Sequence, residues 1–219
     1  MKRFVPVIAL VIAAIVLAAV NATAFAYRWI QGTVNVAGPT AARGAACVGF
    51  YSSATQSGIS PTYLPRAGTN YNAQTYNTNT IFVITGQAVC QWTVNTTTYS
   101  LYEGITVNVP ITVGSWYIKD FYGFGYNGTA TDPLVYVYIK VEQPITDRYV
   151  DANLILYNAS TGAEVAVIDL KTLTGSVTGP ITLRPGNGLQ LDLQINATGT
   201  TSVTFKVGFY VSQEQEAPR

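Results

Sequence analysis

Histidine is absent from this sequence of 219 residues. Histidine is the commonest general base and proton shuttle near neutral pH, and a frequent metal ligand. Its absence excludes the Ser-His-Asp and Cys-His schemes of nucleophilic catalysis. The composition therefore favours a protein that binds or assembles over an enzyme.

Charged residues are also scarce, at 11% of the chain against roughly 25% in an average soluble domain. The eleven acidic residues are scattered, and no pair indicates the facing carboxylates of a glycosidase. No basic patch indicates a nucleic-acid partner, and no polybasic run indicates an anionic membrane. We expect no catalytic residue, no cofactor and no metal site. A calcium site at Asp120, Asp132 or Asp147 is conceivable, but no known ligand spacing supports it.

Only two cysteines occur, Cys47 and Cys90. Their spacing fits neither a zinc site nor a redox motif. In an exported protein such a pair predicts one structural disulfide. The alternative is two buried free thiols.

The first 26 residues have the form of a secretory signal peptide. Lys2 and Arg3 precede an apolar run over residues 4–20, and Ala24-Phe25-Ala26 matches a small-x-small cleavage site. The alternative is a retained transmembrane helix, which such a run could just span. With a cleaved leader the membrane is involved only during export.

The stretch 27–36 directly follows this leader and alternates as an amphipathic β-strand. Ile30, Val34 and Val36 share one face with Gly32 between them. Residues 37–46 are rich in Ala and Gly and contain Pro39, which predicts an irregular hinge. Once the leader is removed, this strand can pair within its own domain or reach into a neighbour.

The remainder, residues 37–219, predicts a single all-β domain, a jelly-roll-like β-sandwich. The polar stretch 52–80, with Tyr63, Tyr71 and Tyr76, is either a contact surface or a loop that covers one end of the core. Pro110 predicts an edge or a bulge. Beyond the short apolar piece at residues 47–51, the predicted strands cover residues 81–85, 88–95, 105–113, 116–121, 134–142, 150–157, 164–170, 181–183, 189–195 and 202–211.

Two surface features have open interpretations. Asn95, Asn127, Asn158 and Asn196 begin N-glycosylation sequons, which could aid solubility in a chain with so few charges. A group of aromatic residues could form a platform for sugar rings, or could be core residues and cross-strand ladders. This group comprises Trp92, Trp116, Tyr117, Tyr122 and Tyr126.

The N-terminal architecture resembles that of a known family. A leader ending in Ala-Phe-Ala, a strand containing Gly32-Thr33-Val34-Asn35-Val36 and a β-domain behind it are similar to the TasA/camelysin-type biofilm fibre proteins and to the bundling pilins of hyperthermophilic archaea. The cysteine pair, the Tyr- and Asn-rich segment before Ile81 and the lack of acidic residues near the N-terminus depart from the bacterial members.

The resemblance implies donor-strand complementation, in which the N-terminal strand of one subunit completes the sheet of the next. The partner would be the chain itself, as a head-to-tail homopolymer at the cell surface that bundles laterally with like filaments. Two alternatives remain open, a carbohydrate-binding β-sandwich module and a membrane-anchored S-layer or envelope component. The donor strand implied is Tyr27, Arg28, Trp29, Ile30, Gln31, Gly32, Thr33, Val34, Asn35 and Val36.

Overall fold

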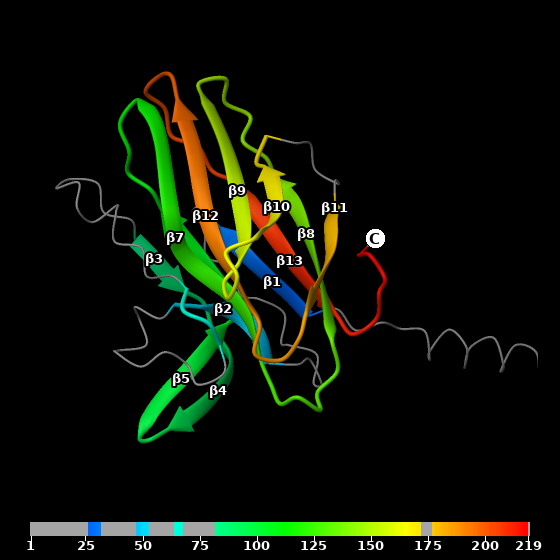
Figure 1. Ribbon diagram of the computed structural model, residues 1–219. Helices are drawn as coiled ribbons and strands as arrows, with labels where there is room; N and C mark the ends of the chain where they lie inside the picture. The colour runs from blue at the N-terminus through cyan, green and yellow to red at the C-terminus, as the bar shows by residue number, and fades with distance from the viewer. Residues whose placement is uncertain (1–25, 32–46, 53–63, 68–81, 172–176, 219) are drawn as a thin grey trace, which may run out of the picture.

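The computed structural model of the chain describes residues 26–31, 47–52, 64–67, 82–171 and 177–218 (Figure 1). These residues form thirteen strands and no helix. The strands are β1 (Ala26–Gln31), β2 (Cys47–Tyr51), β3 (Phe82–Thr85), β4 (Ala88–Val94), β5 (Thr97–Tyr102), β6 (Gly104–Asn108), β7 (Gly114–Asn127), β8 (Val135–Gln143), β9 (Val150–Asn158), β10 (Glu164–Asp169), β11 (Val177–Leu183), β12 (Gly188–Ala197) and β13 (Lys206–Ser212).

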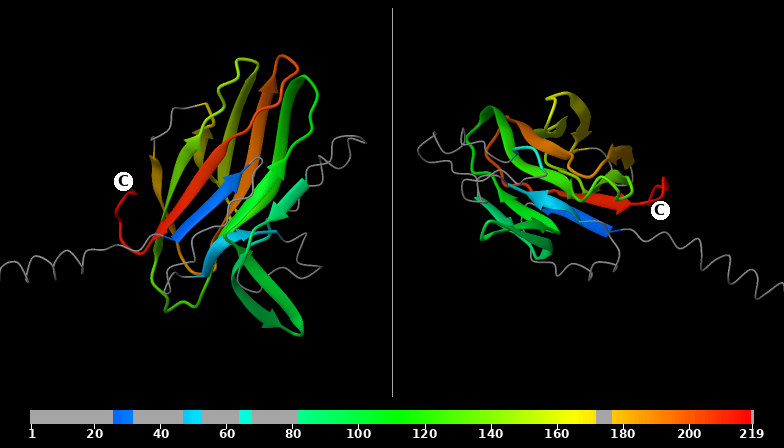
Figure 2. Two further views of the ribbon diagram at one scale, coloured as in Figure 1. Left: turned by 180° about the vertical axis from the view of Figure 1, so that it is seen from behind. Right: turned by 60° about the horizontal axis from the view of Figure 1, so that its bottom comes forward.

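The strands form two sheets that lie in two layers (Figures 1 and 2). The six-stranded sheet has the order β11-β8-β13-β1-β6-β3, and the seven-stranded sheet has the order β10-β9-β12-β7-β2-β5-β4. Among the described ladders every pair is antiparallel except β1 with β6. The all-β prediction is confirmed, whereas the jelly-roll order of the connections stays a prediction.

The core lies between the two sheets. In most of the described strands alternate apolar residues point inward, as the period-two patterns predict. Its centre is a set of three phenylalanines: the ring of Phe209 in β13 lies 5.2 Å from that of Phe50 and 4.8 Å from that of Phe124 in the opposite sheet. These contacts join the layers into one β-sandwich.

One predicted strand is longer in the structure than in the sequence pattern. The prediction at residues 116–121 is part of the longer strand β7, which continues to Asn127 past an irregularity. Asp120 has a φ of +53° there, so the pattern changes phase and hides the second half of the strand.

One strand, β5, has no counterpart among the predicted ones. It pairs with β4 through a tight turn in which Asn95 and Thr96 have φ values of +47° and +73°. The turn lacks the Asn-Gly or Asp-Gly signal of such hairpins.

Two strands are shorter than their apolar alternation suggests, one at its end and the other at its beginning. The strand predicted over 105–113 stops at Asn108, two residues before Pro110, and the one predicted over 202–211 begins at Lys206. Residues 109–113 and 202–205 therefore carry a strand-like sequence without a ladder partner among the described residues. Pro110 follows the end of its strand, in line with its missing donor.

The predicted disulfide is present. Cys47 in β2 and Cys90 in β4 are bonded, with their Cα atoms 5.7 Å apart, so the two-free-thiol alternative is wrong. Beside it, residues 64–67 cover the outer face of the seven-stranded sheet, where Tyr51, Leu64, Ala67 and Leu101 form a second buried cluster. These four residues of the stretch 52–80, residues 64–67, cover the outer face of a sheet and not the predicted end of the core. Tyr63, Tyr71 and Tyr76 lie outside the described residues.

Candidate functional site: the slot of the N-terminal strand

Strand β1 lies inside the six-stranded sheet, between β13 and β6 (Figures 1 and 2). It is antiparallel to β13, from Ala26 opposite Val211 to Gln31 opposite Lys206. It is parallel to β6, with Ile30 opposite Ile105. We call this position the N-terminal slot. A strand there satisfies the backbone donors and acceptors of two neighbours, which would otherwise be open edges.

The structure thus describes the first half of the predicted donor strand within the sheet of its own chain. Tyr27, Arg28, Trp29, Ile30 and Gln31 belong to β1, as does Ala26, the last residue of the predicted leader. The second half, Gly32, Thr33, Val34, Asn35 and Val36, lies outside the described residues, as does the leader up to residue 25. Transfer of the strand between subunits stays a prediction.

Arg28 is buried on the inner face of β1, with 2% of its surface exposed. Its Nε donates a 2.7 Å hydrogen bond to the backbone oxygen of Val48 in the opposite sheet. The bond joins β1 to β2 across the sandwich. A shift of β1 by one residue would turn Arg28 to the outer face and break this bond, so Arg28 helps to fix the register.

Burial lowers the pKa of Arg28 to about 10, while the nearby charge of Glu103 acts to raise it. The guanidinium is therefore still a cation at neutral pH. A buried cation needs hydrogen-bond acceptors close by. In the observed register the backbone oxygen of Val48 is one such acceptor.

The floor of the slot is apolar. Ile105 of β6 and three residues of β13, Val207, Phe209 and Val211, are all buried. Arg28 lies opposite Phe209 and Ile30 opposite Val207 in the ladder. Removing β1 would expose this floor, and each such side chain contributes on the order of 1.5–3 kcal/mol when buried.

On the outer face of the slot, glycines and tyrosines lie in register with β1. Trp29 lies in register between Gly208 on one side and Gly104 on the other. Both glycines are buried. Tyr27 lies in one cross-strand row with Tyr210 and Tyr138. The two strands that flank position 29 therefore carry no side chain beside it.

The tyrosine row continues into a polar group on β8. Tyr210 Oη donates to Glu142 at 2.6 Å, and Glu142 forms a 2.9 Å ion pair with Lys206. Burial, together with Glu142, raises the pKa of Tyr210 above its ordinary value. Tyr210 therefore stays a donor throughout the physiological range.

The aromatic residues predicted as a sugar platform do not come together. Tyr122 and Tyr126 are buried in the core. Trp92 stacks on Tyr99 in the β4–β5 hairpin, and Trp116 donates to the backbone oxygen of Thr112. Tyr117 alone is well exposed, at 47%. The platform interpretation is wrong, and the alternative of core and cross-strand aromatics is correct.

The seven-stranded sheet contains a buried carboxylate that the sequence pattern does not predict. Asp192, 1% exposed, accepts hydrogen bonds from Tyr117 Oη and from the backbone nitrogen of Asp120, both at 2.7 Å. Gln190 donates to it at 2.8 Å. Burial and the bonds to Tyr157 and Asp192 raise the pKa of Tyr117. Because the carboxylate binds the irregular backbone at Asp120, its role here is to hold the bulge of β7.

The four sequon asparagines differ in their surroundings. Asn95 and Asn196 are exposed, although Asn196 accepts a hydrogen bond from Ser115. Asn158 caps its own turn by accepting from Ser160 and Thr161. Asn127 is half-buried, and its Oδ1 is enclosed without a partner. Asn95 and Asn196 are therefore the exposed glycan acceptors among the four.

The three conceivable calcium ligands serve separate turns. Asp120 lies at the bulge of β7, Asp132 accepts from Thr129, and Asp147 accepts from Tyr149 and Thr201. Across the described ranges, no group of three His, Cys, Asp or Glu residues is placed to hold a metal ion.

The sequence matches no protein-family model and no curated protein. In the part of the chain that is described, no helix has the length and apolar character to cross a membrane.

Proposed function

We propose that this chain is the structural subunit of an extracellular filament and that it polymerises by strand exchange. In the filament, the N-terminal strand of one subunit occupies the N-terminal slot of the next. Each subunit then receives one strand and donates one. A head-to-tail contact of this kind does not close on itself and produces an open fibre.

The observation that carries the proposal is the place of β1. It is the first described strand of the chain, yet it lies between β13 and β6 in the interior of a sheet. Residues 32–46 separate it from β2. An element at one end of a domain that fills an internal gap and is joined by a long connection can be exchanged between copies with its contacts unchanged.

The energetics also favour a strand in this place. Without β1, the edges of β13 and β6 would lie open above the apolar floor formed by Ile105, Val207 and Phe209. Open apolar edges recruit other strands. Strand addition combines main-chain hydrogen bonds for affinity with alternating side chains for specificity. Arg28, which reaches Val48 across the sandwich, adds a requirement for register.

The disulfide agrees with a protein that works outside the cell. The Cys47–Cys90 bond indicates an oxidising environment. The leader predicted for residues 1–26 supplies the export route, and the low charge fraction suits a surface that is buried in an assembly. The resemblance to fibre proteins and bundling pilins implies the same function.

Electron microscopy of the protein that starts at Tyr27 tests the proposal. We expect filaments from this protein and separate monomers from a variant that lacks residues 27–36. A synthetic peptide of residues 27–36 should bind the shortened variant and raise its melting temperature, because it refills the slot. A scrambled peptide of the same composition is the control.

Two results would contradict the proposal. One is filaments of unchanged appearance from the shortened variant. The other is a purified protein that stays monomeric at every concentration while its strand remains in its own slot.

A further inference from the structure

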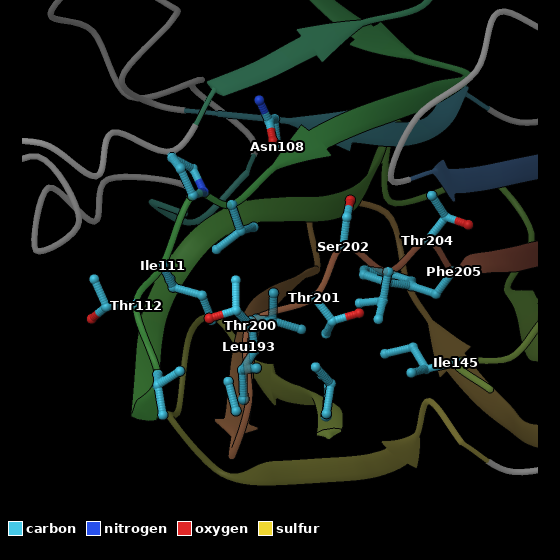
Figure 3. Close-up of a pocket in the computed structure, with 18 of the residues that line it drawn as sticks. Asn108, Ile111, Thr112, Ile145, Leu193, Thr200, Thr201, Ser202, Thr204 and Phe205 are labelled. Atoms are coloured by element: carbon cyan, nitrogen blue, oxygen red, sulfur yellow. The ribbon is translucent and has the colours of Figure 1, made fainter. Parts of the chain in front are cut away.

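A cavity of about 690 Å³ lies at the end of the sandwich toward which β1 points (Figure 3). Two segments that have no ladder partner among the described residues form its sides, 109–113 and 200–205. Its floor comes from the seven-stranded sheet and includes Val150, Leu193 and Ile195. Most of the lining residues are apolar, and none of them is charged.

The register of β1 leads directly into this cavity. Gln31, its last residue, lies opposite Lys206 of β13 and Thr106 of β6. In Figure 3 the blue arrow of β1 ends beside Thr204 and points toward the labelled residues of the cavity. A strand that continued in the same register would run between the two sides of the cavity.

The side chains of such a strand fit the two faces. Continued pairing places Val34 between Val203 and Val109, and Val36 between Thr201 and Ile111, by the offsets of the two ladders. Positions 34 and 36 have the same parity as Arg28, which points inward, so both valines would face the apolar floor. Thr33 and Asn35 would face solvent, beside the exposed residues Thr204 and Ser202.

The backbone of the β6 side is oriented for this pairing. The Gly104 oxygen accepts from Gly86 on the β3 side, so polar groups of even-numbered residues face β3 and those of odd-numbered residues face β1. In the same alternation, Val109 and Ile111 would turn their N–H and C=O groups to the cavity. The nitrogen of Pro110, which has no hydrogen, would face the other way. The proline therefore does not interrupt the proposed ladder.

We propose that this cavity is the acceptor site for residues 32–36 from the N-terminal strand of a second copy of the chain. The inference rests on the proposed strand exchange and extends it, because it locates the second half of the groove. Five residues span about 17 Å. Their insertion would turn segments 109–111 and 201–205 into continuations of β6 and β13.

Chain length favours a second copy as the donor. Eight residues separate Arg28 from Val36, an advance of about 26 Å along a strand. Cys47 adjoins Val48, which is bonded to Arg28, so a chain that filled its own cavity would have to return that distance over residues 37–46. A Gly-rich chain of ten residues has a root-mean-square span of about 17 Å. Return within one chain would stretch the connection to about one and a half times its root-mean-square span, at a cost in conformational entropy that donation to a neighbour avoids.

Cysteine cross-linking between two different chains tests the site. One protein carries Asn35→Cys and the other Ser202→Cys, and the two are mixed before assembly and then oxidised. The predicted pair faces solvent, with Cβ atoms within the range of a disulfide. The matched control is Val34→Cys mixed with Ser202→Cys, whose side chains would point to opposite faces. A third protein carries Asn35→Cys and Ser202→Cys in one chain.

We expect a reducible dimer from the first mixture, at least tenfold more abundant than from the control, with a 35–202 linkage in its peptide map. Filaments without this linkage would overturn the acceptor site but leave strand exchange standing. A linkage only within single chains of the third protein would overturn both the second copy as donor and the proposed function. A retained apolar small molecule in the native mass spectrum would assign the cavity to a ligand instead.

Discussion

Arg28 and Tyr51 each bring a polar group into the interior, and each donates a hydrogen bond to a backbone oxygen. Arg28 donates to Val48 at 2.7 Å, and Tyr51 donates to Pro65 at the same distance. Both bonds join segments that are separate in the sequence. Alternation along residues 28, 30 and 32 places Arg28 on the inner face, but its charge argues against burial, so the sequence pattern alone does not predict it. The partner oxygen, which resolves the conflict, becomes visible only in three dimensions.

Tyr51 makes the free energy of unfolding depend on pH in the alkaline range. Burial, with a contribution from Asp120, raises its pKa above the ordinary value of about 10. Above pH 10 the unfolded chain loses this proton and the folded chain keeps it, so the free energy of unfolding falls with rising pH. The slope approaches about 1.4 kcal/mol per pH unit for each proton so retained. Below pH 10 the contribution is fully present.

Urea denaturation at pH 8 and pH 11 checks this expectation in the wild type and in Tyr51→Phe. At pH 8 the variant should be less stable by about 0.5–1.5 kcal/mol, because it loses the hydrogen bond to Pro65. At pH 11 the difference should shrink or change sign. The raised pKa values of Tyr117 and Tyr210 act on both proteins alike. Equal losses of stability between the two pH values would show that Tyr51 does not retain its proton.

At the scale of elements, the alternating segments of the sequence predict most strands, and their failures have identifiable causes. The phase change at Asp120 conceals half of β7, and the Asn95-Thr96 turn conceals β5. The alternation through residues 109–113 and 202–205 predicts strands where no ladder partner is described. Side-chain pattern reports the faces that a segment can present, whereas a strand also needs a neighbour for its backbone.

The disulfide connects two strands that do not pair with each other. It joins β2, inside the seven-stranded sheet, to the edge strand β4, and it closes a loop with a sequence separation of 43 residues. In the loop-entropy account such a bond stabilises the fold by about 4 kcal/mol. The double variant Cys47→Ser/Cys90→Ser should therefore lose roughly 2–4 kcal/mol.

Chemical denaturation with and without dithiothreitol measures this contribution. The wild type should lose stability in the reductant, whereas the double variant should not respond to it. In hydrogen exchange, reduction should lower the protection of the backbone amides mainly in the β4–β5 hairpin. The amides of the β9–β12 region should keep their protection. A wild type that is indifferent to complete reduction would contradict the assigned role.

At the scale of the whole molecule, composition and alternation are sufficient to predict an all-β fold, but they do not identify the neighbours of each strand. The pairing of β1 with β13 joins residues near opposite ends of the chain. The N-terminal slot and the cavity beyond it both depend on that pairing. A single sequence does not identify such pairs, because many strands with an apolar face could pack beside β13 equally well. The resemblance to fibre proteins implies that the N-terminal strand is the functional element, and the structure adds a position for the first half of that strand.

The two proposals predict one continuous groove. Its first half is the N-terminal slot with Arg28 as the register-fixing contact, and its second half is the cavity between residues 109–113 and 200–205. A donated strand of ten residues, roughly 33 Å long, would occupy both. The subunit would then be complete only in the presence of its neighbour.

Helical reconstruction of the filament by cryo-electron microscopy tests this account most directly, because density shows from which subunit the strand in the slot originates. We predict that the strand between β13 and β6 traces through residues 37–46 into the adjacent subunit. We also predict that density for Val34 and Val36 lies over Leu193 and Ile195. A strand that traces back to β2 of the same subunit would contradict the account.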